Sequence, residues 1–175
     1  GWADLKDQTV GADADREKVK TLDLNIDYKK LGLDTVDYAP KLECYLPSRE
    51  MREEMKETER RNQVMVVLPG GGYGMTSSRE HEPIIFQYLA AGFTVFSIRY
   101  SVKPSVFPRA LYEVYTSIAK IREHADEWMI DKDKIAVCGF SAGGHLTASV
   151  GAYWNEDFVK RDLGFTDEHK PNALI

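Results

Sequence analysis

Three short runs of continuous apolar residues constrain the fold more than any other feature of the chain. They occupy residues 64–68, 94–98 and 135–138, and the first is closed by a proline and glycines. A strand that is apolar at every position, rather than at alternate ones, is typical of a parallel sheet covered on both faces. These runs therefore predict three central strands of a buried parallel sheet.

Helical patterns lie between these runs. Residues 80–91 and 108–128 place apolar side chains at spacings of three and four. Strand and helix in alternation indicate βαβ units, and hence an α/β fold with a doubly wound, mostly parallel sheet and helices on both faces. Upstream, residues 22–26 and 41–46 alternate apolar with polar residues, which favours half-buried antiparallel strands. Residues 173–175 resemble the start of another buried strand.

The third apolar run leads directly into the pentapeptide Gly-Phe-Ser-Ala-Gly, residues 139–143. A strand, this G-x-S-x-G turn and an apolar helix in succession are the setting of a nucleophile elbow, with Ser141 as the nucleophile. The turn forces the serine into a strained backbone conformation, so we expect φ above zero at Ser141. Gly139 and Gly143 remove side chains that would clash in so tight a turn, and Gly144 lets helix and strand approach. The alternative is a glycine-rich turn whose serine only caps a helix.

A second glycine-rich segment, residues 69–74, follows the first apolar run. A phosphate-binding loop is excluded there, because Met75 stands where G-x-G-x-x-G requires its third glycine. The glycines at 139 and 144 have P-loop spacing, but His145 and Leu146 replace the required Lys and Ser or Thr. What remains is an oxyanion-hole loop, whose glycines let backbone N–H groups face a substrate oxygen.

The candidate site is assembled from these two segments. We expect the N–H groups of Gly71, Gly72 and Ala142 to form the oxyanion hole, and Tyr73 and His81 to line the substrate pocket. No H-E-x-x-H or other metal-ligand spacing occurs, so neither a metal nor a cofactor is expected.

Both segments resemble those of a known family. Residues 68–73 and 139–146 are similar to the two signatures of bacterial α/β-hydrolase esterases, and to the acetyl-esterase and acetyl-xylan-esterase-like branch in particular. Residues 107–111 and 130–135 add to the resemblance, which covers about 40–175. Pro69 takes the place of the histidine found in the HGGG loop of many lipases, which leaves the backbone donors intact. The resemblance implies a serine esterase acting on short acyl esters, with acetyl groups on carbohydrate as the expected case.

The acid and base of the triad are not found among these residues. In the elbow's chain order they follow the serine, and the histidines there are His145, expected to pack or bond locally, and His169, expected at the surface. Asp157 and Asp162 precede any further strand and are poor acid candidates. We therefore expect the triad Asp and His in a C-terminal segment beyond residue 175, and no esterase activity from this chain alone.

Domain boundaries follow from the same pattern. Residues 1–20 are polar and aperiodic and are expected to form an arm. Residues 21–175 are expected to form the N-terminal portion of a single α/β-hydrolase domain, truncated before its C-terminal strands. The charged stretch 48–62 is expected to be a solvated helix or loop that connects rather than packs.

The composition of the chain limits the kinds of partner that it is expected to bind. A net charge of −5 argues against nucleic acid, and no apolar stretch is long enough to span a membrane. The serine motif and the family resemblance imply a small-molecule ester as the partner. Cys44 and Cys138 are expected to be buried free thiols, which favours a reducing, cytoplasmic location, although secretion with a removed signal peptide stays open. Two other functions also stay open: a non-catalytic, hydrolase-like ligand-binding module and a peptidase of the same fold.

Overall fold

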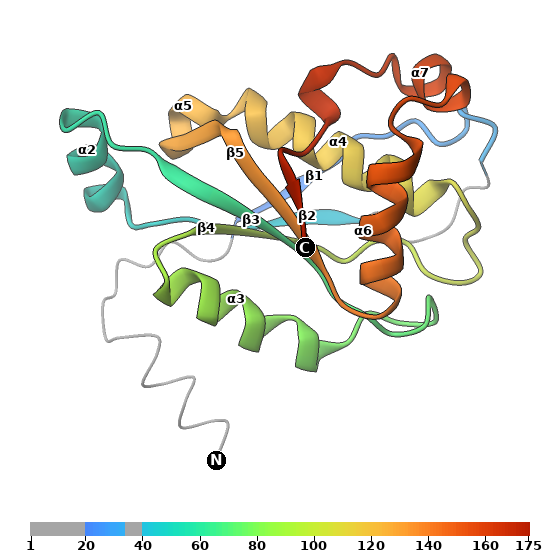
Figure 1. Ribbon diagram of the computed structural model, residues 1–175, viewed down its shortest axis with the longest axis horizontal. Coiled ribbons are helices and arrows are strands. Elements are labelled where there is room, and N and C mark those ends of the chain that lie inside the picture. The colour runs from blue at the N-terminus through green and yellow to red at the C-terminus, as the bar shows by residue number, and fades with distance from the viewer. Residues whose placement is uncertain (1–19, 34–39) are drawn as a thin grey trace.

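A computed structural model describes residues 20–33 and 40–175, which build one six-stranded sheet with helices packed against it (Figure 1). The strands are β1 (Lys20–Asp23), β2 (Lys41–Tyr45), β3 (Asn62–Leu68), β4 (Thr94–Ile98), β5 (Ile130–Gly139) and β6 (Ala173–Leu174). The α-helices are α2 (Arg49–Glu57), α3 (Glu82–Ala90), α4 (Arg109–Glu123), α5 (Ala125–Trp128), α6 (Ala142–Tyr153) and α7 (Asp157–Leu163), and the 3-10 turns are η1 (Ser78–Glu80) and η2 (Asp167–His169).

The sheet has the order β1-β2-β4-β3-β5-β6. The strands β4, β3, β5 and β6 run parallel, whereas β1 pairs with β2, and β2 with β4, in antiparallel fashion. This arrangement confirms the mostly parallel sheet and the antiparallel pair upstream. Because β3, β4 and β5 are parallel, their carboxyl ends share one edge of the sheet, where ligands bind in open α/β sheets.

Both faces of the sheet are buried, as the continuous apolar runs require. Along β3, Val64, Val66 and Leu68 belong to the larger core, which also contains apolar side chains of α4 and α6. The intervening Met65 and Val67 belong to a smaller core with α3. Figure 1 shows α3 on one side of the sheet and α4 and α6 on the other, which confirms helices on both faces.

The structure differs from the sequence expectations at four elements. The strand expected at 22–26 ends at Asp23, and the helix expected at 108–128 divides into α4 and α5 at His124. The charged stretch 48–62 does pack, since α2 buries Met55. The strand expected at 173–175 covers only Ala173–Leu174, as β6, which pairs with β5 in parallel and is the edge strand of the described sheet.

Residues 1–19 of the expected N-terminal arm lie outside the described residues, and Lys20 already begins β1. Within the described ranges, no helix is long and apolar enough to cross a membrane, and no group of three or more potential metal ligands occurs. Cys44 and Cys138 are free and buried, which confirms the expectation for both thiols.

Candidate active site

Ser141 occupies the sharp turn between β5 and α6. Its backbone has φ 51° and ψ −115°, which confirms the expected positive φ. Such a conformation costs a non-glycine residue roughly 1–3 kcal/mol and clusters at functional sites. The hydroxyl makes no capping bond to α6, so the alternative of a simple helix cap is wrong. The side chain is exposed, and its hydroxyl has no hydrogen-bond partner among the described residues.

The neighbouring glycines are required by close backbone contacts. A Cβ on Gly139 would overlap the carbonyl oxygen of Gly143 and the hydroxyl of Thr147, and a Cβ on Gly143 would overlap the carbonyl oxygen of Leu68. A Cβ on Gly144, by contrast, would lie 3.2 Å from its nearest neighbour, the carbonyl oxygen of Gly139. Gly143 therefore lets α6 approach β3, and the 3.2 Å contact at Gly144 agrees with the expectation that this glycine lets the helix approach the strand before it, β5.

The second glycine-rich segment begins a tight loop, residues 70–80, that follows β3. Gly71 and Gly72 have φ values of 132° and 61°, which favour glycine, and the loop closes through a hydrogen bond from the N–H of Ser77 to the carbonyl oxygen of Gly70 (2.8 Å). A Cβ on Gly71 would overlap the carbonyl oxygen of Met75. The backbone conformation of this loop therefore requires glycine at position 71 and favours it at position 72.

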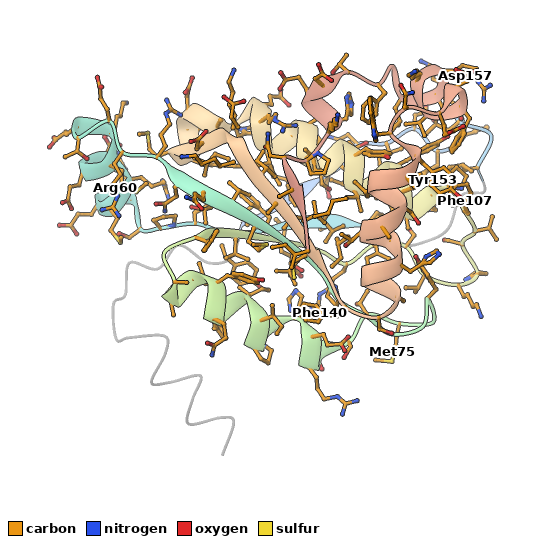
Figure 2. The ribbon with its side chains drawn as sticks, viewed as in Figure 1. Arg60, Met75, Phe107, Phe140, Tyr153 and Asp157 are labelled. Carbon is orange, nitrogen blue, oxygen red and sulfur yellow. The ribbon has the colours of Figure 1, made fainter. Side chains whose placement is uncertain are left out.

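This loop lies directly against the serine turn. A Cβ on Gly70 would be 2.7 Å from the carbonyl oxygen of Phe140 and 3.0 Å from the Cβ of Ser141. The N–H of Phe140 donates to the carbonyl oxygen of Leu68 (3.1 Å), which ties the ends of β3 and β5 together. Figure 2 shows Phe140 and Met75 near the N-terminal end of α6. The two sequence motifs thus form one site at the carboxyl edge of the sheet.

Three backbone donors remain available at this site. The N–H groups of Gly71, Gly72 and Ala142 donate no hydrogen bond within the described part of the chain. Ala142 is the first residue of α6, where unsatisfied N–H groups and the positive end of the helix dipole favour negative charge. An arrangement of this kind can stabilise the oxyanion of a tetrahedral intermediate.

Glu80, which the sequence analysis did not single out, bonds to the same loop. Its Oε2 accepts a hydrogen bond from the backbone N–H of Gly70 (2.9 Å). The Gly70 donor is therefore already occupied. A glutamate among other charged residues carries no sequence signal for such a role, because the contact depends on how the loop folds back.

Tyr73 and His145 join the loop to α6. The Tyr73 hydroxyl and Nδ1 of His145 are 2.9 Å apart, and their rings meet edge to face. Burial raises the pKa of Tyr73, so this hydroxyl stays protonated at neutral pH. The expectation of a local partner for His145 was wrong, because its partner is 72 residues away in sequence.

His81 is placed differently from the expectation that it lines the pocket. Only 2% of the residue is exposed, and its Nε2 lies 2.7 Å from Oε2 of Glu43 on β2. Burial alone would raise the pKa of Glu43, but the hydrogen bond with His81 and the charges of His81 and Arg99 outweigh it and lower that pKa. His81 thus joins α3 to the antiparallel part of the sheet.

The remaining histidines are also engaged elsewhere. His124 stacks on Trp128 and bonds to Glu127. His169 accepts from the N–H of Thr166, and burial lowers the pKa of this half-buried ring. Among the described residues, none of the chain's 4 histidines hydrogen-bonds to Ser141.

A buried polar network, also absent from the sequence expectations, supports the neighbouring segment after β4. Glu113 on α4 is fully buried and accepts from the N–H of Ser101 (2.7 Å) and from the hydroxyl of Tyr28 (2.9 Å), and its Oε1 lies 3.4 Å from Nε of Arg109. Burial raises the pKa of Glu113 despite these bonds. The segment reaches the site where the N–H of Lys103 donates to the carbonyl oxygen of Tyr73 (2.7 Å).

The chain is similar to several known esterases and α/β hydrolases. The chain is 37% identical over 131 residues to an arylesterase of Saccharolobus solfataricus, a match that covers 73% of this chain and 42% of the relative. The crystal structure of MGS-M1, an α/β hydrolase from a deep-sea metagenome library, has 36% identity and a TM-score of 0.63 over 78% of this chain and 51% of that one. An acetyl ester-xyloside bifunctional hydrolase from Caldicellulosiruptor lactoaceticus gives a TM-score of 0.71 at 25% identity, over 90% of this chain and 56% of that one.

These matches show the α/β-hydrolase fold, and the chain covers 42%, 51% and 56% of the length of these three proteins, respectively. The family described as BD-FAE matches residues 51–174, which include β3, the glycine loop and the serine turn. The match extends over most of the chain. The protein therefore belongs to the BD-FAE family.

Proposed function

We propose that the protein is a serine carboxylic-ester hydrolase with Ser141 as its nucleophile. The observation that carries this proposal is the strained backbone of Ser141, whose exposed hydroxyl lies beside the loop that holds Gly71 and Gly72. Strain of this kind is retained where it serves a reaction. Similarity to an arylesterase and to α/β hydrolases supports an ester as the substrate.

The reaction proceeds through an acyl-enzyme. Oγ of Ser141 attacks the carbonyl carbon of the ester while its proton passes to a base, and the carbonyl oxygen becomes an oxyanion. The N–H groups of Ala142, Gly71 and Gly72 stabilise that oxyanion, and the bond to the alcohol then breaks with return of the proton to the alcohol. Water attacks the acyl-enzyme in the same way and releases the acid and free Ser141.

The base, in this proposal, comes from residues outside these 175. His81 is held by Glu43, and His145 by Tyr73, while the other two histidines lie in contacts of their own. Residues 21–175 would then be the N-terminal portion of one hydrolase domain, with the acid and base supplied by the portion of the relatives' length that this chain does not span.

For the substrate we propose short acyl esters, with acetyl groups on carbohydrate as the first to test. The support is the likeness to an enzyme whose title names it an acetyl ester-xyloside hydrolase.

The test is Ser141→Ala in the full-length protein, assayed with p-nitrophenyl acetate and acetylated xylan. Loss of the nucleophile should lower kcat by roughly 10⁴-fold or more, because the other members of the site cannot act without it. Ser48→Ala is the control: it removes the hydroxyl that caps α2, which costs about 1 kcal/mol of stability and should leave kcat unchanged. A folded Ser141→Ala variant with near-normal turnover would refute the assignment.

The same assays separate the two alternative functions. A peptidase of this fold would cleave a peptide substrate faster than p-nitrophenyl acetate. A ligand-binding module would bind ester without turnover in the wild-type protein. Its wild-type and Ser141→Ala forms would then be indistinguishable.

A further inference from the structure

Glu80 is the one carboxylate that bonds to the glycine loop beside Ser141 within the described residues. It ends the short turn η1, and its Oε2 accepts from the N–H of Gly70 at 2.9 Å. Around the position that a Cβ would take on Gly70 lie this carboxylate oxygen, the carbonyl oxygen of Phe140 at 2.7 Å and the Cβ of Ser141 at 3.0 Å. The carboxylate oxygen and the Cβ of Ser141 therefore lie on the same side of the Gly70 backbone, the side on which a Cβ would project.

We propose that Glu80 is a positioning residue for the oxyanion hole, an inference that rests on the proposed esterase function. It acts through Gly70, and no hydrogen bond joins it to Ser141 within the described residues. Its carboxylate holds Gly70 so that the next two N–H groups, of Gly71 and Gly72, face the reacting oxygen.

The hydrogen bonds of Gly70 support this role. Its carbonyl oxygen accepts from the N–H of Ser77 (2.8 Å), and its N–H donates to Glu80 (2.9 Å). Both polar groups of this buried residue are thus bound by one short segment, residues 77–80. This segment is itself closed by a hydrogen bond from the N–H of Glu80 to the carbonyl oxygen of Ser77 (3.3 Å). The loop is fixed at its root, next to β3, and left open at Gly71 and Gly72.

The hydrogen bond from Gly70 to Glu80 determines which N–H groups can form the oxyanion hole. Gly70 N–H cannot serve in the oxyanion hole while Glu80 holds it, so the hole is formed by Gly71 and Gly72 with Ala142. Without the carboxylate, the buried N–H of Gly70 would lose its partner, which costs free energy, and the loop would shift to regain one. A displacement of about 1 Å at a catalytic donor can cost 100-fold in rate.

The test compares Glu80→Ala with Glu80→Gln in the full-length protein. Glutamine keeps an oxygen at the same position and should hold kcat within a few-fold of wild type. Alanine should lower kcat by roughly 10- to 100-fold, which lies below the loss of a direct oxyanion donor. KM should change little, and the affinity for a trifluoromethyl ketone inhibitor, which mimics the tetrahedral intermediate, should fall by the same factor as kcat/KM. Glu53→Ala, an exposed residue of α2, is the matched control and should match wild type in each measurement.

Amide hydrogen exchange supplies a readout that does not depend on turnover. Exchange at residues 70–77 should accelerate in Glu80→Ala and stay near wild type in Glu80→Gln. The inference is overturned if alanine leaves both kcat and exchange unchanged, or if glutamine is as impaired as alanine, since the charge rather than the hydrogen bond would then matter. Loss of activity in Ser141→Ala with normal activity in Glu80→Ala would reject this inference and leave the proposed function in place. Normal activity in Ser141→Ala would reject the function itself.

Discussion

Substitution of Gly143 by alanine should damage the serine turn, whereas the same change at Gly144 should be tolerated. A Cβ on Gly143 would overlap the carbonyl oxygen of Leu68 and lie 2.7 Å from both the Leu68 carbonyl carbon and the Pro69 carbonyl oxygen. A carbon and an oxygen that are not bonded normally stay about 3.3 Å apart or more. All three clashing atoms are backbone, so neither a rotamer change nor a flexible side chain can relieve the contact.

The magnitude follows from two opposing effects. Overpacking in a well-packed region costs roughly 1–3 kcal/mol, and we place Gly143→Ala at the upper end because β3 or α6 must move. Alanine is favoured over glycine in a helix by up to about 1 kcal/mol, which leaves a net loss near 2 kcal/mol. At Gly144 the nearest atom would be 3.2 Å away, so the small strain and the helix preference should cancel to within about 1 kcal/mol.

Urea denaturation of both variants measures this difference. Gly143→Ala should lower the midpoint without changing the slope, and in a thermal melt a loss of about 2 kcal/mol corresponds to roughly 4–8 °C. Its kcat should also fall, because any shift of α6 moves both Ser141 and the N–H of Ala142. If the two alanine variants have equal stability and equal turnover, the close approach of α6 to β3 does not depend on Gly143 and the reasoning fails.

Two further predictions concern Glu43 and Glu113, two carboxylates held in ion pairs. The pKa of Glu43 is lowered on folding, so its ion pair stabilises the protein above the unfolded-state pKa of about 4.3, and this stabilisation is lost as the pH falls below that value. In urea titrations between pH 6 and pH 3, the free energy of unfolding of Glu43→Gln should therefore fall less steeply with pH than that of wild type. An equally steep fall in both proteins would contradict the assignment. Glu113→Leu should cost about 3–5 kcal/mol, because Arg109 and the N–H of Ser101 lose their buried carboxylate, and a variant that melts like wild type would show that the network contributes no stability.

Much of the fold could be predicted because its signals are local. The run at 64–68 is apolar at every position, and the structure buries it between two cores. The strained serine turn was also predictable, because only glycines fit at 139 and 143. The break at His124 and the buried Met55 were missed, since charged helical segments give little indication of what a single apolar residue will contact.

The contacts that join distant segments could not be read from the sequence. Glu80 reaches Gly70, and Tyr73 reaches His145, only because the loop folds back against β3 and α6. His81 was placed in the pocket by its nearness to the loop in sequence, but the start of α3 directs it toward Glu43. Neither residue type nor spacing distinguishes a side chain that faces the site from one that faces the sheet.

Covalent labelling of Ser141 tests the central claim most directly. The full-length protein is treated with a fluorophosphonate, which reacts with activated serines, and the modified peptide is identified by mass spectrometry. Our account predicts one phosphonyl group, located on Ser141, with loss of ester hydrolysis in proportion to labelling and no labelling of Ser141→Ala. Complete esterase inhibition with the label on another residue, or turnover that persists after Ser141 is fully modified, would contradict it.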